Sequence, residues 1–137
     1  MELRSKTGVE PIAMRDTLRK MVELRNSGKR FALLSVADQT PTRSEIHYWL
    51  QFLNQDTGVF IGPERLAQKF DMAVLYCEIK RLGFSRFDTR VTLITDAPNS
   101  CPEHAITDRF YQLLEESIIS APENWVWSHR RWKHQRN

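Results

Sequence analysis

The chain has 137 residues, of which 41% are hydrophobic and 27% charged. These proportions exclude a disordered chain and favour one globular domain over residues 1–137. No apolar stretch approaches the roughly 20 residues of a membrane-spanning helix, and the N-terminal segment shows no signal-peptide core. Two cysteines, Cys77 and Cys101, are too few for a disulfide framework, which favours a reduced, cytoplasmic setting.

The formal net charge of +3 is unevenly distributed along the sequence. The last nine residues contain four Lys or Arg and no acid, whereas residues 1–128 contain 16 basic and 17 acidic residues. A local basic cluster attracts phosphate-bearing partners such as nucleic acid, anionic lipid or a phosphorylated cofactor. A solvated C-terminal segment without any partner explains the same pattern equally well, so the charge alone leaves both readings open.

The first half of the chain is predicted to contain two helices and one strand. Residues 11–27 have the pattern of an amphipathic helix, with Pro11 in its first turn and Gly28 as its C-terminal cap. Residues 30–37 (RFALLSVA) are short and mostly apolar, as expected of a strand buried on both faces. Residues 40–61 are predicted to be a long connection, and a helix is predicted over 63–70.

The second half is predicted to contain a hairpin and a long helix. Strands are expected over 72–80 and 87–95, with the turn at Gly83-Phe84-Ser85. Ser100 and Glu103 form a capping-box pattern. The helix that they would start ends before Pro122 and carries an apolar stripe, which consists of Ile106, Phe110, Leu113, Leu114 and Ile118.

This order of elements predicts an α/β architecture with a small mixed sheet flanked by helices. Three strands are few for a stable core. We therefore expect a partner chain, a second copy or a larger protein to extend the sheet.

Common catalytic signatures are missing from the sequence. It contains no G-x-S-x-G, no phosphate-binding G-x-x-x-x-G-K-[ST] and no G-x-G-x-x-G. Neither cysteine belongs to a C-x-x-C pair, and the four histidines lack metal-ligand spacing.

Three features could carry function. Asp38-Gln39 follows the predicted strand directly, at the edge where open α/β sheets bind ligands, although a simple turn uses the same residue types. Residues 52–67 contain two glycines and a helix opened by proline, which can present backbone N–H groups to an anion or a carbonyl oxygen. The alternative to such a binding role is that the glycines and the proline are ordinary loop residues.

The third feature is the C-terminal tail, residues 122–133 (PENWVWSHRRWK). Its tryptophans could pack against the domain while Arg130, Arg131 and Lys133 grip phosphate. Aromatic residues interleaved with arginines also suit single-stranded nucleic acid. A packed tail with exposed charges is the alternative without a ligand.

In order and spacing these segments resemble the bacterial lipid A biosynthesis (lauroyl and myristoyl) acyltransferases, a family within the glycerolipid acyltransferase superfamily. The tail is the most specific match, because that family closes with Pro-Glu, an aromatic, a Trp and a His-Arg-Arg-aromatic-Lys run. The other matches are Gly28-Lys29 before the strand that ends in Asp38-Gln39, and residues 52–70. The Asn-Gln-Asp-Thr version of the latter is most similar to Bacteroides-like members. The likeness covers about Leu3 to Lys133 and implies part of a glycerolipid-acyltransferase-like three-layer fold.

The resemblance implies transfer of a fatty acyl group from acyl carrier protein to a hydroxyl of a lipid A precursor. The expected partners are the acyl carrier protein thioester, the lipid A precursor and a membrane surface, with no nucleic acid. The expected location is cytoplasmic, peripheral to the inner membrane. No metal or redox cofactor is implied.

The family's general base is the histidine of a His-x-x-x-x-Asp/Glu motif. Here the fifth residue after His47 is Phe52, that after His104 is Arg109, and that after His129 is His134. We therefore expect no catalytic residue in this chain. It would correspond to the C-terminal half of the family, inactive alone, with the motif-bearing half or a second copy as partner.

Supporting roles follow from the resemblance. Asp38 and Gln39 would line the active-site edge, and Asn54, Thr57 and Gly62 would form an acyl or acceptor pocket. Arg130, Arg131 and Lys133 would meet phosphates of the lipid or of the pantetheine arm, or brace the fold. Two other hypotheses remain open: a phosphate-binding module for nucleic acid or anionic membrane, and a scaffold subunit completing another chain's active site.

Overall fold

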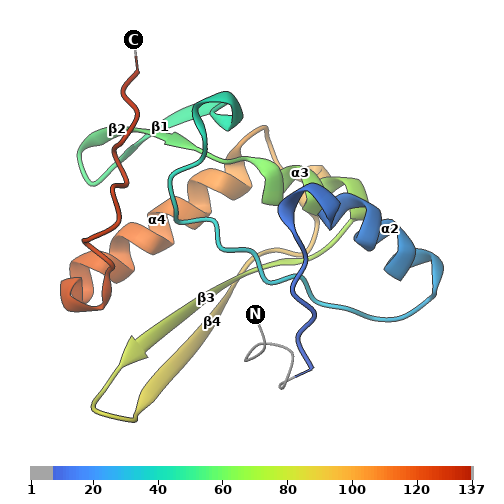
Figure 1. Ribbon diagram of the computed structural model, residues 1–137, viewed down its shortest axis with the longest axis horizontal. Helices are drawn as coiled ribbons and strands as arrows, with labels where there is room; N and C mark the ends of the chain where they lie inside the picture. Colours follow the sequence, from blue (N-terminus) through green and yellow to red (C-terminus); the bar gives the residue numbers. More distant parts are fainter. Residues whose placement is uncertain (1–7, 137) are drawn as a thin grey trace. The chain divides into compact units, whose positions relative to one another are not determined.

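The computed structural model describes residues 8–136, which fall into two compact units, one up to Leu34 and one from Ser35 onward (Figure 1). The N-terminal unit contains a short 3-10 helix, Met14–Asp16, which leads into α2, Thr17–Asn26. Gly28 adopts a φ of +67° and donates its N–H to the carbonyl of Arg25 at 3.1 Å, so it ends the helix as predicted.

The C-terminal unit holds four strands and two longer helices. They are β1 (Tyr48–Phe52), β2 (Gln55–Val59), α3 (Gly62–Phe70), β3 (Val74–Arg81), β4 (Phe87–Thr95) and α4 (Ala105–Ser120). The mixed α/β class is confirmed. The strands form two separate antiparallel pairs, β1 with β2 and β3 with β4, rather than one mixed sheet.

The strand predicted over residues 30–37 is wrong for this structure. These residues belong to neither sheet, and the side chains of Leu34 and Val36 are 79% and 62% exposed. A strand needs a neighbouring edge to satisfy its backbone N–H and C=O groups. None of the described strands pairs with this segment.

The connection predicted over residues 40–61 is also wrong, because it contains the β1–β2 hairpin. Leu53 and Asn54 form its two-residue turn with φ values of 50° and 60°. Positive φ at both central positions matches the twist of antiparallel strands, and Asn tolerates it well. Without the usual Asn-Gly, the turn is easy to miss in the sequence.

The predicted hairpin at residues 72–95 is confirmed as β3–β4, with its turn at residues 82–86. Side chains alternate along β3. Tyr76 packs against Phe110 of α4 with ring centroids 5.7 Å apart, and Glu78 accepts a hydrogen bond from Ser117 of the same helix. Leu75 and Ile79 lie on the opposite face and are more than half exposed.

Helix α4 begins later than the predicted capping box implies. Ser100 lies in a separate 3-10 helix, Pro98–Ser100, and the N-cap position is His104 in a left-handed conformation without a side-chain cap. The buried carboxylate of Glu64 in α3 instead accepts the backbone N–H of Thr107 at 2.9 Å and also its hydroxyl. A carboxylate from another helix therefore satisfies a free donor in the first turn of α4.

One hydrophobic core lies between α4 and the two hairpins. It is built from Phe52, Val59, Ile61, Tyr76, Tyr111, Leu113, Leu114 and Ile118. The apolar stripe predicted for the long helix is thus confirmed, although Phe110 is only partly buried. Among the described residues, no helix has both the length and the apolar character to cross a membrane.

Candidate functional site

The C-terminal tail holds the loop that contains Asp38 and Gln39. The backbone N–H of Thr40 donates to Nε2 of His129 at 3.0 Å. The Thr40 hydroxyl lies 2.9 and 2.8 Å from the carbonyl oxygens of Arg130 and Arg131. Because His129 accepts through Nε2, that nitrogen is unprotonated in this arrangement. A single residue thus connects the loop to three consecutive tail residues.

Arg131 is a buried cation at the centre of this arrangement. Its side chain reaches the carbonyl of Gly58 through both terminal nitrogens, each at 3.1 Å, and the hydroxyl of Tyr111 at 2.9 Å. The residue is 2% exposed. Its Nε has no hydrogen-bond partner within the part of the chain that the structure describes. The guanidinium therefore joins β2 and α4.

Tyr111 continues this chain of hydrogen bonds to the loop. Its hydroxyl accepts from Arg131 and donates to the carbonyl of Ala37 at 3.0 Å. Burial raises the pKa of Tyr111, and the neighbouring Arg131 cation offsets part of that rise. The phenol therefore remains a neutral donor, which fixes the backbone next to Asp38.

The side chain of Thr57 makes its hydrogen bonds within the fold. It is 1% exposed, its hydroxyl donates to the carbonyl of Gln55 at 2.9 Å, and it accepts the indole N–H of Trp132 at 2.9 Å. The Trp132 ring also stacks on Phe52, with centroids 6.2 Å apart. The Thr57 hydroxyl thus both donates and accepts a hydrogen bond in the interior, where it joins β2 to the tail.

The other predicted site residues lie at or near the surface. Asp38 is half-buried and Gln39 is exposed, while Asn54 is exposed at the β1–β2 turn. Arg130 and Lys133 are exposed, and within residues 8–136 their side chains have no hydrogen bond or ion pair. The structure thus brings the Asp38 loop, Thr57 and Arg131 into one neighbourhood.

Gly62 opens α3 and is needed there for space. A Cβ added to it would lie 2.1 Å from the Cζ atom of Phe60. No hydrogen bond joins Asn54 or Gly62 to the tail among residues 8–136. The pocket role predicted for these two residues and Thr57 stays a prediction.

Two histidines, His104 and His129, take part in structural contacts. His104 stacks on Tyr48, with centroids 4.0 Å apart, and its Nε2 lies 3.6 Å from the exposed Glu103 carboxylate. The Tyr48 hydroxyl donates to Asp108 at 2.9 Å. His129 is occupied by Thr40. None of these arrangements aims an imidazole and a carboxylate at a common substrate position.

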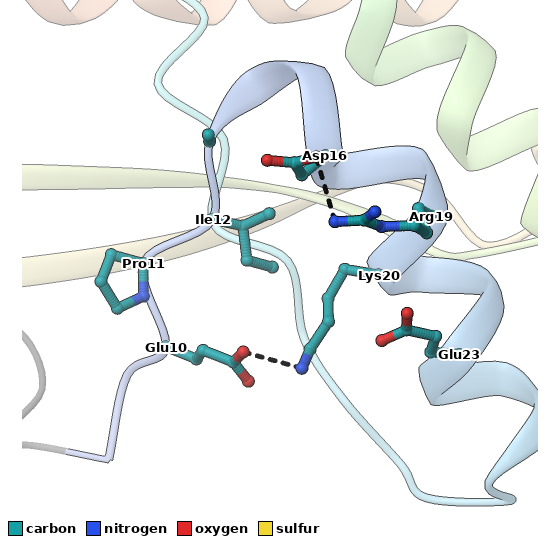
Figure 2. Close-up of a pocket in the computed structure, with 8 residues that line it drawn as sticks. Glu10, Pro11, Ile12, Asp16, Arg19, Lys20 and Glu23 are labelled. Atoms are coloured by element: carbon teal, nitrogen blue, oxygen red, sulfur yellow. Dashed lines mark hydrogen bonds and ion pairs between the residues drawn. The ribbon is translucent and has the colours of Figure 1, made fainter.

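A shallow pocket of about 260 Å³ lies in the N-terminal unit (Figure 2). Four of its charged groups form ion pairs: Lys20 contacts Glu10 at 2.7 Å, and Arg19 contacts Asp16 at 3.2 Å. The hydrogen bond that Lys20 donates to Glu10 raises the pKa of Lys20. These exposed pairs carry no catalytic arrangement.

Comparison with protein families shows to which family the chain belongs. The family described as bacterial lipid A biosynthesis acyltransferase matches residues 1–134. The chain belongs to this family. Comparison with curated proteins and with solved structures gave no match. The lipid A acyltransferase resemblance drawn from the tail and its two companion segments is therefore confirmed.

Sequence reasoning missed the residues that organise this part of the acyltransferase chain. Thr40, Gly58, Tyr111 and Trp132 join the loop, the hairpin and the tail, yet none was singled out as a site residue. Tyr111 lies directly after Phe110 in the apolar stripe, so the pattern marks it as a core residue and conceals its hydroxyl. Trp132 packs against the domain as expected of the tail tryptophans, but no sequence pattern indicates its hydrogen bond to Thr57.

Proposed function

We propose that this chain contributes part of the active-site wall of an acyltransferase that moves a fatty acyl group from acyl carrier protein to a lipid A precursor hydroxyl. The family match over residues 1–134 carries this proposal. The tail motif supports it, because His129, Arg130 and Arg131 hold the loop that presents Asp38 and Gln39. We place the reaction at the cytoplasmic face of the inner membrane, where the lipid acceptor is accessible.

Within this proposal the residues divide into two groups. Asp38 and Gln39 orient the acceptor or the missing base, since the adjacent backbone is fixed by Tyr111 and by the tail. Arg130 and Lys133 are exposed cations suited to phosphates of the lipid or of the pantetheine arm. Arg131 is buried and braces the fold, so we do not assign it to a ligand.

The chain alone is proposed to be inactive. Acyl transfer to a hydroxyl needs a general base, and none of the histidines is followed by an acid at the fifth position. A polypeptide carrying His-x-x-x-x-Asp/Glu would supply that base.

The test is an acyl-transfer assay with acyl carrier protein thioester and a lipid A precursor, read by mass spectrometry. The purified chain is expected to give no product, and turnover would contradict its inactivity. Co-expression with a family segment that carries the motif is expected to restore transfer. Asp38→Asn should lower the restored rate, whereas Glu116→Gln, exposed on α4, should not. Failure of every motif-bearing segment to restore transfer would count against the active-site role.

A second candidate function is phosphate binding by the tail for nucleic acid or anionic membrane. The side chains of Arg130 and Lys133 favour it, because they are exposed and form no ion pair with any residue from 8 to 136. Binding to single-stranded DNA should then be salt-dependent and lost in Arg130→Ala/Lys133→Ala. Absence of binding at low salt would exclude this function.

A further inference from the structure

The tip of the β3–β4 hairpin exposes large apolar side chains. Phe84 is 93% exposed, Leu82 59% and Phe87 62%. The turn is closed by the N–H of Leu82, which donates to the carbonyl of Arg86 at 2.8 Å. These residues therefore lie at the turn end of a hairpin whose strands run alongside α4 (Figure 1).

Two hydrogen bonds join the base of this tip to the rest of the C-terminal unit. Lys80 donates to the hydroxyl of Ser120 at 3.0 Å, and the N–H of Arg81 donates to the side chain of Asn124 at 3.3 Å. Every residue from 81 to 91 is exposed. Soluble proteins rarely expose apolar side chains together in this way unless they bind something.

Basic residues surround the same tip. Residues 80–90 contain four Lys or Arg and one acid, Asp88. The guanidinium of Arg81 is held beside the turn by its Nε, which donates to the carbonyl of Gly83 at 3.0 Å. Arg86 and Arg90 form no ion pair among the described residues. Arg90 lies opposite Glu78 across the two strands and Arg86 lies in the turn. The excess of basic residues around exposed apolar side chains thus matches an anionic surface with an apolar layer beneath it.

We propose that this tip, defined as Leu82, Phe84 and Phe87 with Arg81, Arg86 and Arg90, docks on the surface of a bilayer that contains anionic phospholipid. The apolar side chains enter the interface between headgroups and acyl chains, while the arginines contact the headgroup phosphates. Basic residues near such a surface are attracted by its negative potential, and buried apolar area adds to the binding. The proposal rests on the membrane-surface setting proposed above and assigns it to a particular element.

The experiment is co-sedimentation of the full chain with phosphatidylcholine vesicles, with and without phosphatidylglycerol, at two salt concentrations. We expect binding only to the anionic vesicles, weaker at high salt. Leu82→Ser/Phe84→Ser should weaken it about tenfold or more, because two apolar anchors are lost. Arg86→Gln/Arg90→Gln should weaken it and flatten its salt dependence. All four positions are exposed, so circular dichroism should show the fold intact.

Two matched controls locate the surface. Ile119→Ser removes an apolar side chain that is 67% exposed on α4, and Arg65→Gln/Lys69→Gln removes two exposed cations of α3. Both should bind as the wild type does. Absence of binding to anionic vesicles would overturn the proposal, as would binding that is lost in the tail variant Arg130→Gln/Lys133→Gln but unchanged in the two tip variants. The proposal would also be overturned if the Leu82→Ser/Phe84→Ser variant kept its affinity for vesicles but lost self-association. That result would make the tip a contact surface for a second copy of the chain. Vesicle binding requires no acyl transfer, so its failure leaves the proposed reaction standing.

Discussion

Arg131 and Arg130 are adjacent in the sequence and occupy opposite environments. Arg131 is buried and donates to Gly58 and Tyr111, whereas Arg130 is exposed. Arg131→Lys keeps the charge but loses the planar fork that reaches both acceptors. We expect it to lower the free energy of unfolding by about 2–4 kcal/mol, because buried acceptors lose charged hydrogen bonds. Urea unfolding measures this loss.

The control for this prediction is Arg130→Lys, an exposed substitution expected to change stability by less than about 0.5 kcal/mol. Equal effects of the two substitutions would contradict the assignment of Arg131 as the bracing residue. The sequence alone does not distinguish these arginines, because the irregular tail has no periodicity from which to read an inward face.

Glu78 should make stability depend on pH. The Ser117 hydrogen bond, followed by Lys80, holds the pKa of the Glu78 carboxyl below its usual 4.5. A folded-state pKa below the unfolded value means that this stabilisation is fully present above about pH 4.5 and is lost as pH falls through the folded pKa. The stability difference between wild type and Glu78→Gln should therefore be larger at pH 6 than at pH 3.

Urea midpoints at the two pH values test the Glu78 prediction. Glu116→Gln provides the control, because Glu116 is exposed on α4 and its ion-pair contact with Arg109 is long, at 3.8 Å. A difference between wild type and Glu78→Gln that stays constant with pH would show that the carboxylate is not stabilised by folding.

The two ends of helix α4 differ in how well the sequence predicts them. Pro122 stops the helix for a local reason, and the helix does end at Ser120. Its start depends on Glu64, which lies far away in the chain and accepts from Thr107. A cap supplied by another helix leaves no signal in the neighbouring sequence, so the local Ser100–Glu103 pattern was misleading.

The start of α3 gives a prediction about packing. A Cβ at Gly62 would overlap the end of the Phe60 ring. Gly62→Ala should therefore cost about 1–3 kcal/mol, as overpacking usually does. Shortening the ring in Phe60→Leu/Gly62→Ala should remove most of that cost relative to Phe60→Leu alone. Thermal unfolding of the four proteins measures the coupling.

Gly83→Ala is the matched control for α3, because an added Cβ at that position meets nothing within 4 Å. It should have little effect on the melting temperature. Independent, additive effects of the Phe60 and Gly62 substitutions would show that the ring can move aside without cost.

At the scale of the whole molecule, local patterns other than the β1–β2 hairpin were predicted well, and long-range pairings were not. The β3–β4 hairpin and the apolar stripe of α4 follow from patterns within a few residues. The extended segment 30–37 needs a partner edge that its own sequence cannot provide. Likewise, the tail motif identified the family, but its contacts with Thr40, Gly58 and Thr57 arise only when distant segments meet.

These distant contacts make the tail part of the fold, and two truncations test that conclusion. Ending the chain after Ser128 removes Arg131 and Trp132, which reach β2 and stack on Phe52. We expect this truncation to lose cooperative thermal unfolding, because it opens the core and leaves buried acceptors unpaired. Ending it after Lys133 removes residues whose described members are exposed or only half-buried, and should shift the melting temperature by no more than about 2 °C.

Circular dichroism at 222 nm follows the thermal unfolding of both truncated proteins. A protein that ends at Ser128 and melts like the full chain would show that the tail is accessory to the fold. Its basic residues would then have to be explained by a ligand.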